Sequence, residues 1–249
     1  MNAIDLAIIG GTGLYQLPGL SHLTRIDVDT PYGQPSAAII LGELDGARLA
    51  FLARHGEDHA LAPHQVNYRA NVWALRHAGA QRVLGINSVG GIRADMAPRT
   101  LALPDQLIDY THGRVSSFCD AEHAAVQHIE FAQPYSASLR ASVMAAAVAS
   151  STTIIDGGCY AATQGPRLET CAEIARLRRD GCDLVGMTGM PEAALARELD
   201  LDYACLAIVA NWAAGCADEA PITLDEVIAN VEAASKDLPS LLAAIARKQ

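Results

Sequence analysis

The chain has 249 residues, 46 of them alanine, and a formal net charge of −10. Hydrophobic residues make up 51% of the sequence, which excludes an intrinsically disordered chain, and the length allows a sizeable core. Because the charge balance is acidic, the chain has no general attraction for nucleic acid or for an anionic membrane surface, and neither is expected as a partner.

Apolar runs separated by turn residues predict alternating strands and helices. In chain order, strands are expected at residues 5–10, 24–29, 37–44, 47–53, 82–87, 106–109, 152–156, 183–186 and 203–210. Helices are expected at residues 68–78, 136–149, 169–180, 191–199 and 224–248. The turn Asp45-Gly46 favours a hairpin, and Asn67 and Thr223 are suitable helix caps. The pattern predicts one α/β domain over residues 1–249, with a central mixed β-sheet flanked by helices.

The cysteines and the first residues indicate the compartment. The six cysteines include no CxxC pair and none stands beside a histidine in a zinc-ligand pattern, so we expect free thiols and no metal site. Met1 to Asp5 lacks the basic and apolar regions of a signal peptide, and no uncharged stretch is long enough to span a bilayer. These features predict a soluble cytoplasmic protein.

Two segments at strand ends have the residue types that bind phosphate. In Gly10-Gly11-Thr12-Gly13, backbone N–H groups and a hydroxyl could face an anion. This turn lacks the last glycine of a dinucleotide fingerprint and the lysine of a P-loop, and a plain turn would explain it equally. Arg54 offers a bidentate hydrogen-bond donor, and His55 offers a donor whose charge changes near neutral pH. An arginine and a histidine exposed to solvent would explain the same two residues.

Four further segments add polar groups at strand ends. Residues 87–91 and 187–192 could form other walls of an anion site, or simply be turns. Glu169 is expected in the first turn of a helix, where it could cap the helix or accept a hydrogen bond from a ligand N–H. Asn211 ends an apolar strand and needs a partner for its amide. Phosphate donors combined with one carboxylate and one amide suggest phosphorolysis, without specifying the substrate.

Together these segments resemble the trimeric purine nucleoside phosphorylase and methylthioadenosine phosphorylase family, from Leu6 to about Ala234. The resemblance rests on Ile9-Gly-Gly-Thr-Gly-Leu14, Pro31-Tyr-Gly-x-Pro-Ser36, Ala53-Arg-His-Gly56, Val66-Asn-Tyr-x-Ala-Asn71, Gly165-Pro-Arg-Leu-Glu169 and Met187-Thr-x-x-Pro-Glu192. It implies a nucleoside phosphorylase fold, a homotrimer, and a pentosyltransferase that uses inorganic phosphate as co-substrate and needs no cofactor.

The resemblance also implies roles for individual residues. Asn211 and His55 would be catalytic, Met187 would contact the ribose, and His128 would reach the pocket of a neighbouring subunit. Phosphate would be held by Thr12, Arg54, His55, Asn87, Ser88 and Thr188.

The sequence departs from the methylthioadenosine branch of the family at the base. That branch has a serine and two aspartates where this chain has Glu169, Asn211 and Ala213. A Glu169 carboxylate can accept the N1–H of hypoxanthine and an Asn211 amide can serve its O6, whereas adenine presents the reverse pattern. Such a mismatch costs about 1–3 kcal/mol for each unpaired group.

The 5′ side of the site resembles the methylthio branch. Ordinary 6-oxopurine enzymes have a histidine at the position of Leu224, whereas Leu224, Val227 and Ile228 here give an apolar helix face. Core packing alone would also explain this face. The expected reaction is phosphorolysis of S-methyl-5′-thioinosine to hypoxanthine and 5-methylthio-α-ribose 1-phosphate.

Other functions remain open on the sequence. In the same class they are a methylthioadenosine phosphorylase, or a 6-oxopurine (inosine or guanosine) nucleoside phosphorylase of broad specificity. In other classes they are a nucleosidase that uses water, and a binding protein without turnover.

Overall fold

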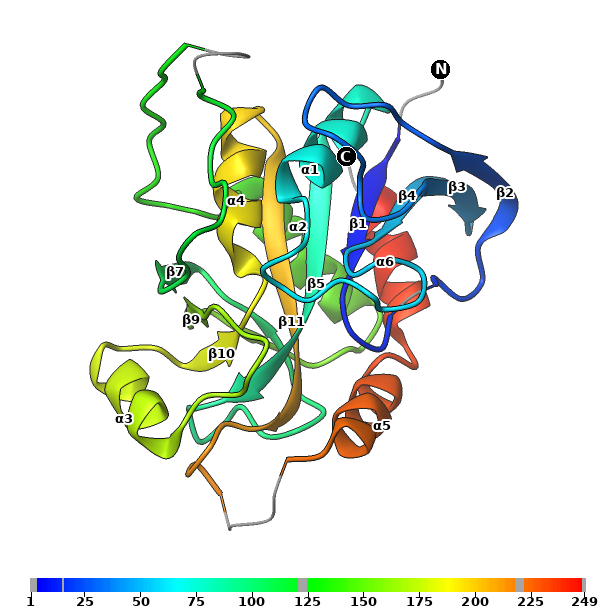
Figure 1. The fold of residues 1–249 in the computed structure, drawn as a ribbon. Helices are drawn as coiled ribbons and strands as arrows, with labels where there is room; N and C mark the ends of the chain where they lie inside the picture. The colour runs from blue at the N-terminus through cyan, green and yellow to red at the C-terminus, as the bar shows by residue number, and fades with distance from the viewer. Residues whose placement is uncertain (1–3, 15, 121–124, 218–221, 248–249) are drawn as a thin grey trace.

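The computed structural model describes residues 4–14, 16–120, 125–217 and 222–247, which form a large sheet covered by helices on both faces (Figure 1). The strands are β1 (Leu6–Gly10), β2 (Ser21–Ile26), β3 (Ile39–Leu44), β4 (Ala47–Ala53), β5 (Arg82–Gly91), β6 (Leu101–Leu103), β7 (Gln106–Asp109), β8 (Ile154–Asp156), β9 (Cys159–Ala162), β10 (Leu184–Gly186) and β11 (Asp202–Trp212). The helices are α1 (Tyr68–His77), α2 (Ala137–Ala149), α3 (Cys171–Arg179), α4 (Gly189–Glu198), α5 (Leu224–Ala234) and α6 (Leu238–Arg247). The predicted α/β domain with a mixed sheet is confirmed.

Strand β5 is the centre of the sheet because three strands pair with it. Its first half lies between β1 and β11, both parallel to it, and its last residues pair with the antiparallel β10. The sheet continues through β4, β3 and β2 on one side and through β9 and β7 on the other. The hairpin predicted around Asp45-Gly46 is the antiparallel pair β3–β4.

Alternating strand residues pack into two separate apolar cores, one on each face of the sheet, because successive side chains of a strand point to opposite faces. In β1, Leu6 and Ile8 belong to the apolar cluster that contains residues of α2 and α6. Ala7 and Ile9 belong to the cluster that contains residues of α1 and α4. Both faces of β1 are therefore buried, which explains its uninterrupted apolar sequence.

Side-chain caps fix where several helices begin. Asn67 and Thr223 accept hydrogen bonds from the backbone N–H groups of Ala70 and Glu226, as expected from the sequence. The prediction for Glu169 was wrong in detail. Thr170 is the N-cap of α3 and forms a capping box with Glu173, so Glu169 lies before the helix and not in its first turn.

Three other expectations are corrected by the structure. The final helix is two helices, α5 and α6, because a proline at position 239 would collide with the carbonyl of residue 235 in a continuous helix. Strand β5 does not end at Asn87 but continues through Ser88 to Gly91, since β11 pairs with it along this length. Strands β6 and β9, which have three and four residues, were not predicted.

The described residues between β7 and α2, 110–120 and 125–136, form neither helix nor strand and lie beside α4 (Figure 1). We call this segment the excursion. It is held there by Glu198, which accepts the Phe118 N–H at 2.7 Å, and by Arg197, which donates to the Gln133 carbonyl. None of the helices within the described ranges has the length and apolar character needed to cross a membrane.

Candidate functional site

A cavity of about 560 Å³ lies where neighbouring strands of the sheet have unequal lengths. Strands β1 and β4 end at Gly10 and Ala53, while β5 and β11 continue beyond them and β10 approaches from the opposite direction. The lining includes eleven of the residues expected in the site, namely Thr12, Arg54, His55, Ser88, Glu169, Met187, Thr188, Asn211, Ala213, Leu224 and Val227. The fold therefore brings together segments that are far apart in the sequence.

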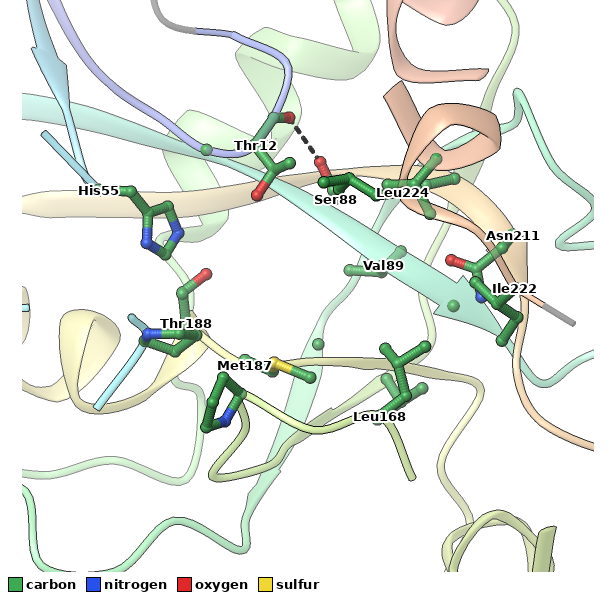
Figure 2. A pocket seen from close by; sticks show the side chains of 18 of the residues that line it. Thr12, His55, Ser88, Val89, Leu168, Met187, Thr188, Asn211, Ile222 and Leu224 are labelled. Carbon is green, nitrogen blue, oxygen red and sulfur yellow. Dashed lines mark hydrogen bonds between the residues drawn. The ribbon is translucent and has the colours of Figure 1, made fainter. Parts of the chain in front are cut away.

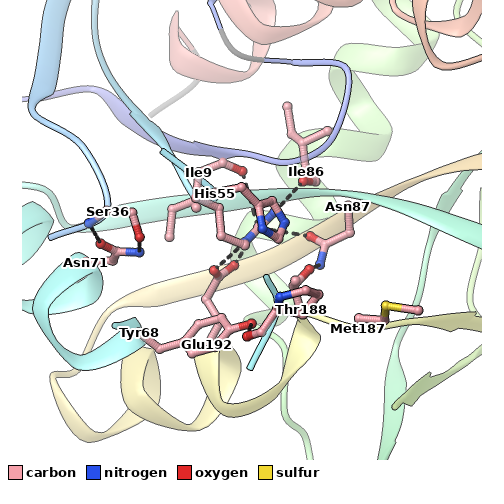
Figure 3. A network of polar contacts seen from close by, with 12 residues as sticks. Ile9, Ser36, His55, Tyr68, Asn71, Ile86, Asn87, Met187, Thr188 and Glu192 are labelled. Carbon is pink, nitrogen blue, oxygen red and sulfur yellow. Dashed lines mark hydrogen bonds and ion pairs between the residues drawn. The ribbon is translucent and has the colours of Figure 1, made fainter. Parts of the chain in front are cut away.

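Arg54, which lines the cavity, forms a fully buried ion pair with Glu192. The Glu192 carboxylate and its polar contacts are drawn in Figure 3. Two parallel hydrogen bonds of 2.8 Å join Nε and Nη2 of Arg54 to the two carboxylate oxygens. Tyr203 donates its hydroxyl to Glu192 Oε1 at 2.8 Å. Burial lowers the pKa of the Arg54 guanidinium, but the facing carboxylate outweighs this effect and the pKa is raised overall. Arg54 is therefore a permanent cation, held in one orientation.

Among the described residues, one N–H of Arg54 has no hydrogen-bond partner. Nη1 carries two N–H groups and donates one to the Ile86 carbonyl at 3.0 Å. Gly11 lies over this nitrogen, and a Cβ at that position would be 2.9 Å from Nη1 and 2.8 Å from the Ile86 carbonyl oxygen. Glycine is needed at position 11 because a side chain would displace the guanidinium that lines the cavity.

Asn87 lies behind the cavity wall and not in it. Its side-chain oxygen accepts from Arg54 Nη2 at 3.3 Å, and its nitrogen donates to Thr188 Oγ1 at 2.8 Å. Both ends of the amide are thus engaged within the protein, so the expectation that Asn87 touches phosphate directly does not match its position. Thr188 is 7% exposed and lines the cavity. Because its oxygen already accepts from Asn87, its hydroxyl proton is free to donate to a ligand.

His55 is a neutral imidazole with a fixed tautomer. Burial, the nearby Arg54 charge and other neighbours lower its pKa to about 4. Its Nδ1 is 2.8 Å from the Leu61 carbonyl, and because a carbonyl only accepts, Nδ1 carries the proton. Nε2 then keeps its lone pair. Figure 2 shows the ring on the same side of the cavity as Thr12 and Thr188.

The glycine turn after β1 is held by Ser88. The Ser88 hydroxyl donates to the Thr12 carbonyl at 2.8 Å (Figure 2), so its proton supports the turn. The Thr12 side chain is left half-buried in the cavity wall. Thr12, His55 and Thr188 make one end of the cavity polar.

A β-bulge places Asn211 in the cavity. Strand β11 shifts register against β5 between Val209 and Asn211, so Ala210 is an extra residue. The Asn211 side-chain nitrogen donates to the Trp212 carbonyl at 2.8 Å, and its oxygen faces the cavity (Figure 2). The group that this amide presents to the cavity is therefore an acceptor, and not the donor expected for O6 of a base. Ala213 is buried beside Gly90 and offers no polar group there.

Glu169 and Met187 also line the cavity. Glu169 accepts a hydrogen bond of 2.6 Å from the Thr163 hydroxyl through one carboxylate oxygen. Met187 packs against Gly165, where φ is +58° and a Cβ would lie 2.4 Å from the Met187 sulfur. Glycine at position 165 therefore allows both the left-handed backbone and the close approach of Met187.

The start of α5 forms an apolar wall, with one correction to the expected residues. Leu224 and Val227 line the cavity together with Ile222. Ile228 does not line it, because it is turned by about 100° from Val227 around the helix. Leu224 is 62% exposed at the rim, so core packing does not account for it.

Asn230 fastens α5 to the bulge. Its nitrogen donates to the Ala210 carbonyl at 2.8 Å, and its oxygen accepts from Arg99 Nε at 2.8 Å. Asn230 is 6% exposed, so both ends of its amide are satisfied inside the protein. The apolar wall and the bulge before Asn211 are thus joined by one side chain.

His128 is exposed on the excursion between β7 and α2 and does not line the cavity of its own chain. Within the described ranges, no group of three or more His, Cys, Asp or Glu side chains is arranged to hold a metal ion.

Sequence reasoning missed four residues that support the site. Glu192 was noted only as part of a motif, although a buried arginine requires a carboxylate partner. Thr163, Arg114 and Asn230 stand in segments without a recognisable pattern. Arg114 donates to the carbonyls of Met187 and Met190 at 2.8 and 2.7 Å, which no local spacing could reveal.

The sequence matches the phosphorylase superfamily over residues 5–247. The chain belongs to this superfamily. A protein of Xanthomonas campestris pv. campestris called "Probable S-methyl-5'-thioinosine phosphorylase" is 63% identical over 246 residues, which cover 99% of this chain and 98% of that protein. A "Probable 6-oxopurine nucleoside phosphorylase" of Thermococcus kodakarensis is 43% identical over 95% of this chain and 90% of its own length.

A solved structure of this superfamily is closely similar. The methylthioadenosine phosphorylase from Schistosoma mansoni in complex with adenine matches with a TM-score of 0.92 and 28% identity, over 98% of this chain and 91% of that chain. The strand arrangement around the cavity is thus that of a superfamily member.

The buried ion pair should dominate the stability of this phosphorylase domain. Replacing Glu192 with alanine leaves an uncompensated buried arginine and should lower the free energy of unfolding by about 3–5 kcal/mol. As a control, Asp95→Ala removes a pair with Arg93 in which the aspartate side chain is 56% exposed, and should cost less than about 1 kcal/mol. Urea unfolding of the three proteins measures both values, and equal costs would contradict the dominant role of the buried pair.

The low pKa of His55 should make stability depend on pH. The pKa is about 4 in the folded protein and 6.5 ordinarily, so below about pH 6.5 the unfolded chain binds a proton that the folded chain does not. The free energy of unfolding should therefore fall as the pH drops from 6.5 toward 4, by about 2 kcal/mol at pH 5. His55→Asn should reduce the difference between pH 7 and pH 5 by about this amount. Urea titrations at both pH values test this, and the exposed His22→Asn serves as the control. An equal change in the two variants would contradict the role of His55.

Proposed function

We propose that this chain catalyses phosphorolysis of S-methyl-5′-thioinosine, giving hypoxanthine and 5-methylthio-α-ribose 1-phosphate. The observation that carries the proposal is the pairing, in one cavity, of a Glu169–Asn211 base wall with an apolar Leu224–Val227 wall. Relatives named as probable S-methyl-5′-thioinosine phosphorylases, at 57–63% identity over nearly the whole chain, support it. The enzyme class is then a pentosyltransferase.

The polar end of the cavity suits inorganic phosphate. The Thr188 hydroxyl, the Thr12 hydroxyl and the remaining Arg54 N–H can donate to phosphate oxygens, while neutral His55 accepts a hydrogen bond from the P–OH of hydrogen phosphate through Nε2. Phosphate supplies the nucleophilic oxygen itself. The proposed reaction therefore needs inorganic phosphate as co-substrate and no cofactor.

The reaction exchanges one bond at the anomeric carbon for another. A phosphate oxygen bonds to C1′ from the face opposite the base as the bond from C1′ to N9 breaks, and the bonding electrons move into the purine. The purine takes up one proton at N7, which balances the proton that hydrogen phosphate gives up. The cavity-facing oxygen of Asn211 can accept a hydrogen bond from N7–H of the leaving base. His55 and Asn211 thus act at the two ends of the reacting system, and most of the rate enhancement comes from orientation and electrostatics.

The base wall favours hypoxanthine over adenine. One oxygen of Glu169 accepts from Thr163, and the other is left to accept the N1–H of a 6-oxopurine. Adenine has an acceptor at N1, and buried Ala213 provides no carboxylate for its amino group. Each unpaired group costs about 1–3 kcal/mol.

The 5′ wall favours a methylthio group over a hydroxyl. Leu224, Val227 and Ile222 offer only carbon atoms, so a 5′-hydroxyl would lose its hydrogen bonds to water without replacement.

We further propose that the protein is a cytoplasmic homotrimer in which His128 approaches the pocket of a neighbouring subunit. Support comes from the excursion that carries His128, where Val115 and Val126 are 60% and 79% exposed. A second copy of the chain would cover these apolar side chains. The ligands are then a nucleoside and phosphate, with no nucleic acid or membrane partner.

A comparison of three nucleosides tests the proposed reaction. We expect kcat/KM for methylthioinosine to exceed those for methylthioadenosine and inosine by at least about ten-fold, because each competitor leaves at least one polar group unpaired. Release of hypoxanthine should require phosphate. Faster cleavage of methylthioadenosine or inosine would favour the alternative phosphorylases, turnover without phosphate would indicate a nucleosidase, and no turnover would indicate a binding protein.

The substitution Leu224→His should change the 5′ preference. A histidine at the rim can hydrogen-bond a 5′-hydroxyl, so the ratio of kcat/KM for inosine to that for methylthioinosine should rise about ten-fold. Leu23→His is a matched control, since Leu23 is 63% exposed but lies on β2, away from the cavity. An unchanged ratio in Leu224→His would remove Leu224 from the 5′ wall.

A further inference from the structure

The hydroxyl of Thr163 is the contact that fixes the orientation of Glu169. It donates to Glu169 Oε1 at 2.6 Å and lies 3.4 Å from the Gly186 carbonyl oxygen. A hydroxyl has one proton, and the much shorter distance assigns it to the carboxylate. Among the described residues, no other side chain donates a hydrogen bond to Glu169.

Thr163 itself is held rigidly from both sides. Its backbone N–H donates to the Gly186 carbonyl at 2.8 Å, which places it directly beside the end of β10. Arg114 Nη2 donates to the Thr163 carbonyl at 3.3 Å and to the Gln164 carbonyl at 2.8 Å. The hydroxyl therefore projects from a backbone that cannot easily rotate.

Glu169, in contrast, stands on a segment that does little to orient its side chain. It precedes the N-cap Thr170 and is half-buried, so helix packing does not constrain it. The last torsion of a glutamate side chain is soft, with a broad distribution of angles. A hydrogen bond to Oε1 restricts this torsion and directs Oε2 as a pure acceptor.

We propose that Thr163 is a positioning residue that sets the preference for 6-oxopurine over 6-aminopurine nucleosides through Glu169. The inference rests on the proposed function, because it assigns Oε2 to the N1–H of the base. Thr163 does not touch the substrate in this assignment. Its hydroxyl reduces the orientational freedom that Glu169 would otherwise lose on binding a 6-oxopurine, and it contributes nothing to a base that has no N1–H.

The test measures kcat/KM for methylthioinosine and methylthioadenosine in Thr163→Val and Thr163→Ser. Valine keeps the shape and removes the hydroxyl, and serine keeps the hydroxyl. We expect Thr163→Val to lower kcat/KM for methylthioinosine by about three- to ten-fold, the effect of one net hydrogen bond, and to change methylthioadenosine by less than about two-fold. Thr163→Ser should behave as the wild type. Thr163→Ala serves as a second hydroxyl-free variant should Thr163→Val fail to fold.

A double-variant cycle separates positioning from a general structural role. In a Glu169→Ala background, Thr163→Val should have no further effect on the specificity ratio. An effect that persists undiminished in that background, an unchanged ratio in both hydroxyl-free variants, or a serine variant that behaves like valine would overturn the inference. If the wild type itself prefers methylthioadenosine, the proposed function fails independently of these variants.

Discussion

The buried ion pair between Arg54 and Glu192 is the interaction on which the site depends. Arg54 follows β4, Glu192 is in the first turn of α4, and the guanidinium also donates to the Ile9 and Ile86 carbonyls of β1 and β5. Tyr203 adds β11 to the same network. Four strands and a helix are thus joined at one point. Because an unpaired charge could not stay there, neither partner can leave the network without cost.

This network also explains how an acidic chain can place a guanidinium beside the proposed phosphate site. The chain carries a net charge of −10 and has only two lysines, yet the fold places a permanent guanidinium at the polar end of the cavity. Asn87 extends the network to Thr188 and leaves the Thr188 proton available. Net charge therefore says little about ligand preference here, because the local arrangement of donors decides it.

Much of the sheet could be predicted from the sequence, because long apolar runs such as β1 and β11 and capped helices such as α1 have clear local patterns. The residues that line the cavity could be predicted from the sequence, because they follow strand ends or match family motifs. What could not be predicted depends on contacts between distant segments. Asn87 faces Arg54 rather than the cavity, and the role of Thr163 depends on the loop that carries Glu169. Ile228 shows that an apolar residue at helical spacing need not face the ligand.

The anchoring of α5 by Asn230 has a consequence for the dimensions of the site. The 5′ wall and the strand that carries Asn211 are tied through the Ala210 carbonyl, which restrains their separation. The distance between the two ends of the proposed nucleoside site is then restrained by the fold. A ligand must match that length with its base and its 5′ substituent at the same time. The proposed site would therefore select ligands by the distance between these two groups as well as by their chemistry.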